Sequence, residues 1–282
     1  MSLLKAYYRL TKPGIVYGNT FHLVAGYIIA LSPASSIGSF LGATIGTMLF
    51  IGSACVVNNI IDRNIDKKME RTMKRATVTG QIPLGHAIVF AAILGSLGVA
   101  VLALYSNWLV FLLGCIAYFS YVVVYGYAKR TTSWSTVIGS VPGAIPLVAG
   151  YVADSGVMTL GAWLLFALLA IWQMPHFYAI ALYRKEQYAS TGLPLITTVR
   201  SDESVRKRSI VYGIAYLLVV GAMGATHVIG PVALTMLIAG GLWWLWGMLR
   251  PMDDSKQWGR KVFFQSLILT ILLFVAAIFS HL

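Results

Sequence analysis

Apolar residues run along this 282-residue chain in long stretches, and short polar segments separate them. A helix rises 1.5 Å per residue, so each stretch is long enough to cross most or all of a hydrocarbon layer about 30 Å thick. The pattern predicts an all-α, polytopic membrane protein with nine transmembrane helices, over residues 14–32, 38–57, 87–105, 108–127, 134–153, 159–181, 209–228, 231–249 and 262–280.

The basic residues support this set of spans. If the N-terminus faces the cytoplasm and the loops alternate, all 21 Lys and Arg residues fall on the cytoplasmic side. The opposite side carries Asp154 and no basic residue. Cytoplasmic loops of membrane proteins are enriched in Lys and Arg, so the distribution predicts an N-in, C-out topology.

Composition agrees with a membrane protein. Hydrophobic residues make up 58% of the chain, charged residues 11%, and the mean hydropathy is +0.78. The net charge of +12 lies in short loops that face anionic lipid headgroups, which argues against a nucleic-acid partner. Cys55 and Cys115 stand alone inside apolar spans and form neither a disulfide framework nor a zinc-site spacing. We expect one membrane domain over residues 1–282 and membrane lipid as its surroundings.

Two long cytoplasmic loops, about 58–86 and 182–208, hold most of the remaining polar groups. In the first loop, Asn58, Asp62 and Asp66 are spaced by four residues. If the preceding helix continues past the membrane edge, the three side chains share one face. Carboxylate and amide oxygens suit Mg²⁺, which commonly binds one or two carboxylates together with substrate phosphates. The neighbouring basic residues would hold the phosphate oxygens: Lys67, Arg71, Lys74 and Arg75. A solvated amphipathic helix with surface ion pairs is the alternative interpretation.

A second group of polar residues ends the fourth predicted span. Tyr121, Tyr125 and Lys129 lie on one helical face, and Arg130 follows. An aromatic belt with a basic anchor explains this pattern structurally. In an enzyme, Lys129 would bind a diphosphate, and the tyrosines would stabilise a carbocation or orient a proton acceptor.

The segment WQMPHFYAIAL, residues 172–182, places polar groups inside a span. Pro175 is expected to break the helix and free backbone groups that lipid cannot satisfy. Gln173 and His176 lie beside this expected break, and polar groups at such depth are functional candidates. His176 is either a packing residue or a contact to substrate or haem iron. His22, in the first span, is ambiguous, whereas His86, His227 and His281 lie near the membrane surfaces and suit structural roles.

Together these segments resemble the UbiA superfamily of intramembrane prenyltransferases. The family signature N-x-x-x-D-x-x-x-D is matched by Asn58, Asp62 and Asp66. Within the superfamily the chain is most similar to the haem-farnesylating branch. That similarity rests on LTKPGI (10–15), NNIIDRNIDKKMERT (58–72), AKRTT (128–132), GSVPGAIPLVAGY (139–151), WQMPHFYAIAL (172–182) and GLPL (192–195).

The resemblance implies nine helices around a central cavity that opens to the cytoplasmic side and laterally to lipid. It implies farnesyl diphosphate and haem B as substrates and Mg²⁺ as the cofactor, bound by Asn58, Asp62 and Asp66. It also implies the bacterial inner membrane, with active-site loops on the cytoplasmic side, and handover of the product to a haem A synthase or a terminal oxidase.

Residue roles follow from the pattern and the resemblance together. We assign catalytic roles to Asp62, Asp66, Lys129 and Tyr125. We assign substrate contacts to Arg63, Lys67, Arg71, Arg75, Tyr121, Arg130, Trp172, Gln173, His176, Glu186 and Tyr188.

Two departures from the superfamily pattern bear on the acceptor. Quinone-type members carry a second Asp-rich motif after the sixth span, whereas this chain reads YRKEQY (183–188), with Glu186 as its only acid. This weakens the case for a second metal and favours haem over a small aromatic acceptor. Relatives often have Arg-Pro where this chain has Arg75-Ala76, so the loop there is expected to differ in shape.

Two other functions remain as alternatives. A related prenyltransferase would use a quinone-precursor aromatic acceptor. A non-enzymatic transporter or haem carrier would show inverted repeats with polar residues near the midplane, or facing His pairs. Here the polar chemistry gathers at one face, and His22 with His176 is the sole plausible pair.

Overall fold

The computed structural model describes residues 2–282, which form helices and no strand. The helices are α1 (Leu3–Leu10), α2 (Pro13–Ala30), α3 (Ile37–Ile61), α4 (Arg63–Asp66), α5 (Ala76–Thr79), α6 (Leu84–Tyr105), α7 (Trp108–Phe119), the π-helical η1 (Ser120–Tyr125), α8 (Gly126–Thr131), α9 (Ser135–Ser155), α10 (Leu160–Tyr183), α11 (Lys185–Ala189), α12 (Ile196–Val199), α13 (Asp202–Ala225), α14 (Pro231–Leu249) and α15 (Ser255–Ile278).

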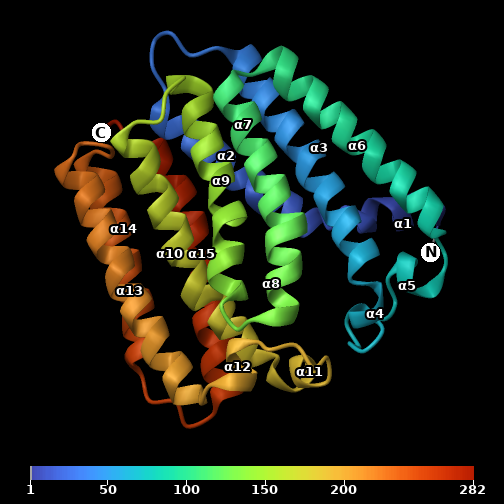
Figure 1. Ribbon diagram of the computed structural model, residues 1–282. Coiled ribbons are helices and arrows are strands. Elements are labelled where there is room, and N and C mark those ends of the chain that lie inside the picture. The colour runs from blue at the N-terminus through green and yellow to red at the C-terminus, as the bar shows by residue number, and fades with distance from the viewer. Residues whose placement is uncertain (1) are drawn as a thin grey trace.

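Long helices form a bundle whose short connections lie at one end and whose long loops lie at the other (Figure 1). The small helices α4, α11 and α12 gather at the lower end of Figure 1, beside the turn between α8 and α9. These segments belong to the loops that carry most of the Lys and Arg residues. The loops that carry these basic residues therefore share one end of the bundle, and the N-in, C-out topology stays a prediction.

Within residues 2–282, eight helices are long and apolar enough to cross a membrane. They correspond to the second through ninth predicted spans, with α7, η1 and α8 acting as one. The remaining predicted span is α2, which has 18 residues and carries Asn19, Thr20 and His22. It packs against α9, α15 and α3, inside the bundle. The all-α, multi-pass architecture is confirmed, and the count of nine spans stays a prediction.

The core is centred on α10, which packs against α9, α13 and α15. Its buried side chains include Leu165, Leu168 and Leu169, which belong to one continuous apolar cluster with Trp244 of α14. Trp172 Nε1 donates a hydrogen bond to the Ser266 carbonyl at 3.2 Å, which ties α10 to α15. Buried indole N–H groups need such a partner because water cannot reach them.

Two glycines bring α2 and α9 into backbone contact. A Cβ on Gly26 would lie 1.9 Å from the Leu147 carbonyl oxygen, and one on Gly150 would lie 1.8 Å from the Leu23 carbonyl oxygen. Small residues allow membrane helices to pack this closely, because dispersion rather than the hydrophobic effect drives their association. The contact holds the more polar α2 beside α9, so both helices line the same cavity.

We expect Gly150→Ala to destabilise the protein, because the methyl group would meet backbone atoms of α2. Overpacking costs about 1–3 kcal/mol, which would lower the unfolding temperature measured in detergent by several degrees. Gly221→Ala in α13 is the matched control, since a Cβ there has nothing within 4 Å. An unchanged unfolding temperature for Gly150→Ala would contradict the close approach of α2 and α9.

Candidate functional site

A cavity of about 1060 Å³ lies between the helices. Residues of α2, α3, α4, α7, η1, α8, α9, α10, α11, α12 and α15 line it, together with Lys12 and the loops after α4 and α11. Its charged lining residues belong to the end of the bundle that carries α4 and the long loops: Lys12, Asp62, Asp66, Arg71, Arg75 and Lys129. The remainder is largely apolar, with side chains such as Phe21, Phe50, Val110, Ile145 and Ile271. The cavity therefore joins a charged mouth to an apolar interior.

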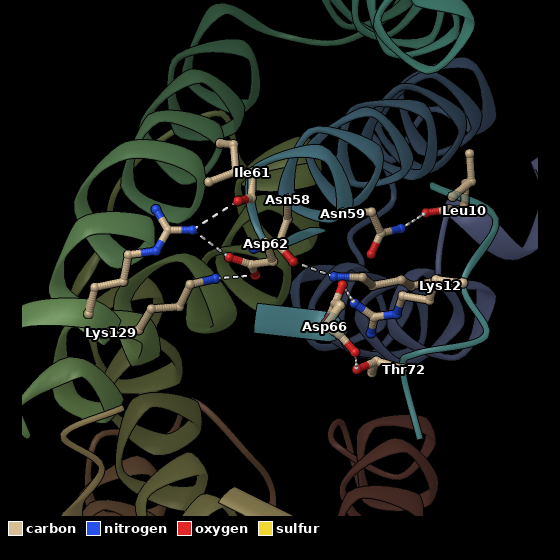
Figure 2. A network of polar contacts seen from close by, with 11 residues as sticks. Leu10, Lys12, Asn58, Asn59, Ile61, Asp62, Asp66, Thr72 and Lys129 are labelled. Atoms are coloured by element: carbon tan, nitrogen blue, oxygen red, sulfur yellow. Dashed lines mark hydrogen bonds and ion pairs between the residues drawn. The ribbon is translucent and has the colours of Figure 1, made fainter. Parts of the chain in front are cut away.

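Asn58, Asp62 and Asp66 meet at the charged mouth (Figure 2). The α3 helix ends at Ile61, and the separate turn α4 follows. The helical spacing nevertheless continues, because the Asp62 amide donates to the Asn58 carbonyl at 2.9 Å and the Asp66 amide to the Asp62 carbonyl at 2.8 Å. The predicted common face is confirmed, although the helix is interrupted at Asp62.

Cationic side chains pair with each member of this oxygen cluster. Lys129 Nζ and Arg130 Nη2 both donate to the Asp62 carboxylate, the latter at 2.9 Å. Arg75 Nη1 lies 2.5 Å from Asp66 Oδ2. Both carboxylates are buried, and buried charges require such partners. Their environment differs from that of a solvated surface helix with exposed ion pairs.

Lys12 is the fourth cation of the cluster. Its Nζ donates to Asn58 Oδ1 at 2.5 Å, and Figure 2 shows it approaching from the side opposite Lys129. Lys12 has a left-handed backbone, with φ of 52°, directly before Pro13. Non-glycine residues in this region carry strain, which persists where the surrounding structure holds it. Asn59 contributes by donating to the Leu10 carbonyl at 2.8 Å, which fixes the chain just before Lys12.

The mouth carries net positive charge. Four basic residues and two acidic residues line it, which leaves a formal charge of +2. Burial lowers the pKa of Lys12 to about 8, with further lowering from Arg75 and Lys129, while Cys55 and Asp62 oppose the shift. Burial also lowers the pKa of Arg71 from its ordinary value. Cations that are incompletely neutralised in a low-dielectric site favour an anionic ligand.

The lowered pKa of Lys12 predicts a pH-dependent affinity for diphosphate. The Lys12 ammonium loses its charge as the pH rises through about 8, so binding should weaken over that range. Inorganic diphosphate can be titrated calorimetrically without a divalent cation, at pH 7 and at pH 9. Lys12→Arg should remove most of the difference, since arginine stays charged at both pH values. Equal pH profiles for the two proteins would contradict a role for Lys12 in anion binding.

The aromatic wall lies in the irregular part of the fourth predicted span. Tyr121 and Tyr125 fall in η1, and their rings stack with centroids 5.7 Å apart. Lys129 Nζ lies 5.5 Å from the Tyr125 ring centroid, and all three residues line the cavity. Their predicted common orientation is confirmed. The π-helical turn was not predicted, and such turns frequently accompany functional sites.

On the opposite wall, α10 contributes Trp172, Gln173 and His176. The α10 helix runs unbroken through Pro175, so the prediction that Pro175 breaks it was wrong. The proline removes one backbone N–H, and packing against α9, α13 and α15 keeps the helix intact. Gln173 Nε2 donates to the Ser140 and Leu169 carbonyls, both at 3.1 Å, so this amide ties α10 to α9.

Some predicted substrate contacts line the cavity and others do not. Besides those above, Arg71, Arg75 and Tyr188 line it. Arg63, Lys67, Arg130 and Glu186 lie outside the lining, although Arg130 reaches Asp62. Lys67 and Glu186 are exposed. Arg75 adopts an extended conformation just before α5, so Ala76 takes the first helical position, where proline is also well tolerated.

Three residues of this region were not assigned a role from the sequence. Lys12 contacts Asn58, which is 46 residues away in the sequence. The Lys-Pro pair at the start of a helix was the only local feature that could have indicated a role for Lys12. Ser266 contacts His176, which is 90 residues away in the sequence, and the residues next to Ser266 form no motif that indicates a role for it. His22 lines the cavity with its ring 5.9 Å from that of Trp172.

Together, a charged mouth with paired carboxylates, an aromatic wall and an apolar interior form one cavity within a bundle of membrane-spanning helices. Residues 20–268 match the UbiA prenyltransferase family, and the chain belongs to that family. It is a multi-pass membrane protein and a prenyltransferase.

The chain is also similar to individual named proteins and solved structures over most of its length. The chain is 38% identical over 268 residues to Protoheme IX farnesyltransferase 2 of Shewanella sp. strain MR-4, which covers 94% of this chain and 86% of the relative. Among solved structures, a UbiA homologue from Aeropyrum pernix superposes with a TM-score of 0.77 at 19% identity, over 96% of this chain and 98% of the other. A UbiA homologue from Archaeoglobus fulgidus, bound to GPP and Mg²⁺, gives 0.73 at 15% identity, over 96% and 99%. At these identities the two solved structures establish the fold.

Proposed function

We propose that the protein transfers the farnesyl group of farnesyl diphosphate to a vinyl group of haem B. Water adds in the same reaction, which gives haem O and diphosphate. The observation that carries this proposal is the single cavity that joins a cationic mouth to an apolar interior lined by Trp172 and His176. The relatives named Protoheme IX farnesyltransferase, at 36–39% identity over most of the chain, support the choice of substrates.

The diphosphate would bind at the mouth. Lys12, Arg71, Arg75 and Lys129 line it and direct positive charge toward the leaving group. Charge-assisted hydrogen bonds to phosphate oxygens are among the strongest that side chains make. The negative charge on the leaving oxygen grows as the carbon–oxygen bond breaks, so these cations stabilise the transition state more than the bound substrate.

The oxygen cluster fits a divalent cation. Asn58, Asp62 and Asp66 offer only carboxylate and amide oxygens, the donors that Mg²⁺ prefers. Each already accepts from a basic side chain: Asn58 from Lys12, Asp62 from Lys129 and Arg130, and Asp66 from Arg75. When bound there, Mg²⁺ would supply additional positive charge to the diphosphate oxygens. The Archaeoglobus homologue bound to GPP and Mg²⁺ supports this assignment.

The aromatic wall would protect the reactive farnesyl group. An allylic cation, formed as diphosphate leaves, is attracted to the faces of the stacked Tyr121 and Tyr125 rings. The surrounding apolar side chains exclude bulk water, which would otherwise capture the cation before the acceptor does. The new carbon–carbon bond joins the farnesyl group to the terminal vinyl carbon, and water then adds its oxygen to the neighbouring carbon and releases a proton.

The acceptor side favours haem over a small phenolic acid. The loop after α10 supplies one acid, Glu186, which is exposed and outside the cavity lining. The lining beyond the mouth presents indole, imidazole and aliphatic groups, which suit a large planar macrocycle.

We place the protein in a bacterial cytoplasmic membrane with the charged mouth on the cytoplasmic side. The gathering of Lys and Arg residues in the loops at that end supports this orientation. Haem O carries a farnesyl chain that water solvates poorly, so release into water would be slow. A membrane partner that accepts haem O, a haem A synthase or a terminal oxidase, would draw it from the cavity.

The acceptor can be tested directly. Purified protein with Mg²⁺ and farnesyl diphosphate should prenylate haem B and leave 4-hydroxybenzoate unchanged when the two acceptors compete in one reaction. Mass spectrometry of both acceptors reports the outcome. Prenylated hydroxybenzoate with unmodified haem would overturn the proposal in favour of a quinone-precursor enzyme.

A further inference from the structure

Beyond the mouth, His176 is held in a single orientation by a short chain of hydrogen bonds. Ser266 Oγ donates to the Phe263 carbonyl at 2.5 Å. The same oxygen lies 2.7 Å from His176 Nδ1. A hydroxyl has one hydrogen, and here the Phe263 carbonyl receives it. Ser266 must therefore accept from His176, so Nδ1 carries the ring proton.

The other ring nitrogen is consequently unprotonated. A second proton would create a cation among apolar groups, which is costly without a carboxylate partner. No carboxylate contacts this ring within residues 2–282. Nε2 accepts no hydrogen bond in that part of the chain, and it is not enclosed by protein. Since His176 lines the cavity, its lone pair is available to a molecule bound there.

Aromatic neighbours fix the plane of the imidazole. Trp172 stacks on it with centroids 4.6 Å apart and an interplanar angle of 25°. Phe263 and Phe177 pack at 5.0 and 5.2 Å. A histidine that ligates a metal commonly donates its other N–H to an oxygen acceptor, which sets both the tautomer and the ring orientation. His176 meets each part of that description.

We propose that His176 Nε2 is an axial ligand of the haem iron, and that Ser266 is the residue that positions it. This inference rests on the proposed function, because it takes haem B as the substrate in this cavity. Coordination donates the Nε2 lone pair to iron and leaves the proton on Nδ1. His22 also lines the cavity and contacts Trp172, but no hydrogen bond fixes its ring among residues 2–282, so we assign the ligand to His176 alone.

Ligation of iron by His176 would position the haem for the reaction. His176 precedes Tyr183, the last residue of α10, by seven positions, which is about 10 Å along a helix. The carboxylates lie at the mouth, at the end of α3. Iron held at His176 would leave the porphyrin edge free to extend toward the mouth, where the farnesyl carbon is activated. Ligation would thus hold the vinyl group in place for attack.

Ferric haem binding, measured without farnesyl diphosphate or Mg²⁺, tests the assignment. The full-length protein in detergent is titrated with haem B and monitored by absorption and electron paramagnetic resonance spectroscopy. Wild type should give an imidazole-ligated spectrum, His176→Ala should lack it, and added imidazole should restore it in that variant. His22→Ala should keep it. His86→Ala is the control for adventitious surface binding, since His86 is exposed and outside the cavity lining.

The positioning role of Ser266 is tested by haem affinity and by the ligand-field spectrum. Loss of the partner of a ligating histidine typically weakens metal affinity by about 10–100-fold, so Ser266→Ala should weaken haem binding and alter the ligand-field spectrum. Ser266→Thr keeps the hydroxyl and should restore both. The proposal is overturned if wild type shows no imidazole ligation, if the His176→Ala spectrum equals that of wild type, or if His22→Ala is the variant that loses ligation. If the iron-ligation proposal fails, the proposed farnesyl transfer can still hold. The mass-spectrometric test decides farnesyl transfer separately, because it measures the product and not iron coordination.

Discussion

Replacing Asp66 by Asn is expected to leave an inserted protein that makes almost no farnesylated haem. The two side chains have nearly the same shape, so the change removes one negative charge and little volume. Asp66 is buried, pairs with Arg75 at 2.5 Å, and lies in the oxygen cluster with Asn58 and Asp62. An amide would bind a divalent cation more weakly and would leave Arg75 without its carboxylate. We expect kcat to fall by about 10²–10³-fold or more, the effect of losing one preorganised electrostatic group.

The same change at Asp62 should be at least as damaging, because Asp62 pairs with both Lys129 and Arg130. Farnesylated haem is measured by mass spectrometry, and binding of Mn²⁺ by electron paramagnetic resonance gives a readout that does not depend on turnover. Asp154→Asn is the matched control, since Asp154 is half-buried in the last turn of α9 and outside the cavity lining. Near wild-type turnover of Asp62→Asn or Asp66→Asn with Mg²⁺ would overturn the metal assignment.

Replacing Lys129 by Met should give the second large effect. Lys129 is 7% exposed, its ammonium donates to Asp62, and it lies over the Tyr125 ring. Methionine keeps most of the length of the side chain but removes the charge that receives the diphosphate. Breaking a buried ion pair by removing one partner costs about 3–5 kcal/mol, part of which Arg130 offsets because it also contacts Asp62.

We therefore expect kcat/KM for farnesyl diphosphate to fall by about 10²-fold or more, and Lys129→Arg to recover part of it. Steady-state assays at several concentrations of farnesyl diphosphate separate the effects on kcat and KM. Lys185→Met removes an exposed cation that pairs with Asp202 and should change neither. A Lys129→Met variant with kcat/KM within twofold of wild type would show that this cation does not contact the substrate.

Features set by local periodicity were predictable from the sequence. The spacing of Asn58, Asp62 and Asp66 placed three oxygen donors on one face, and the backbone hydrogen bonds keep that spacing even though α3 ends at Ile61. The Tyr121, Tyr125 and Lys129 face was predictable for the same reason, because residues four apart are neighbours on a helix. Apolar run lengths likewise predicted an all-α membrane protein.

Features that depend on tertiary packing were not predictable from the sequence. The chain brings Lys12 to Asn58 and Ser266 to His176 across long separations, and neither Lys12 nor Ser266 belongs to a spacing pattern. Pro175 was expected to break α10, yet tertiary packing outweighs the loss of one helical hydrogen bond. The polar character of α2 shows a similar limit. From its sequence, α2 is a transmembrane span with an unusual number of polar residues. The structure explains this composition, because α2 packs against α9 through glycines and several of its residues line the cavity.

In the proposed reaction, one cavity couples departure of diphosphate at the carboxylate cluster to alkylation of haem B. The most direct measurement is the ratio of farnesylated haem to released diphosphate, determined in the same reaction with Mg²⁺ present and with Mg²⁺ chelated. We predict one haem, heavier by one farnesyl and one hydroxyl group, for each diphosphate released, and neither product after chelation. Release of diphosphate without a change in haem mass, or full farnesylation without a divalent cation, would contradict the account.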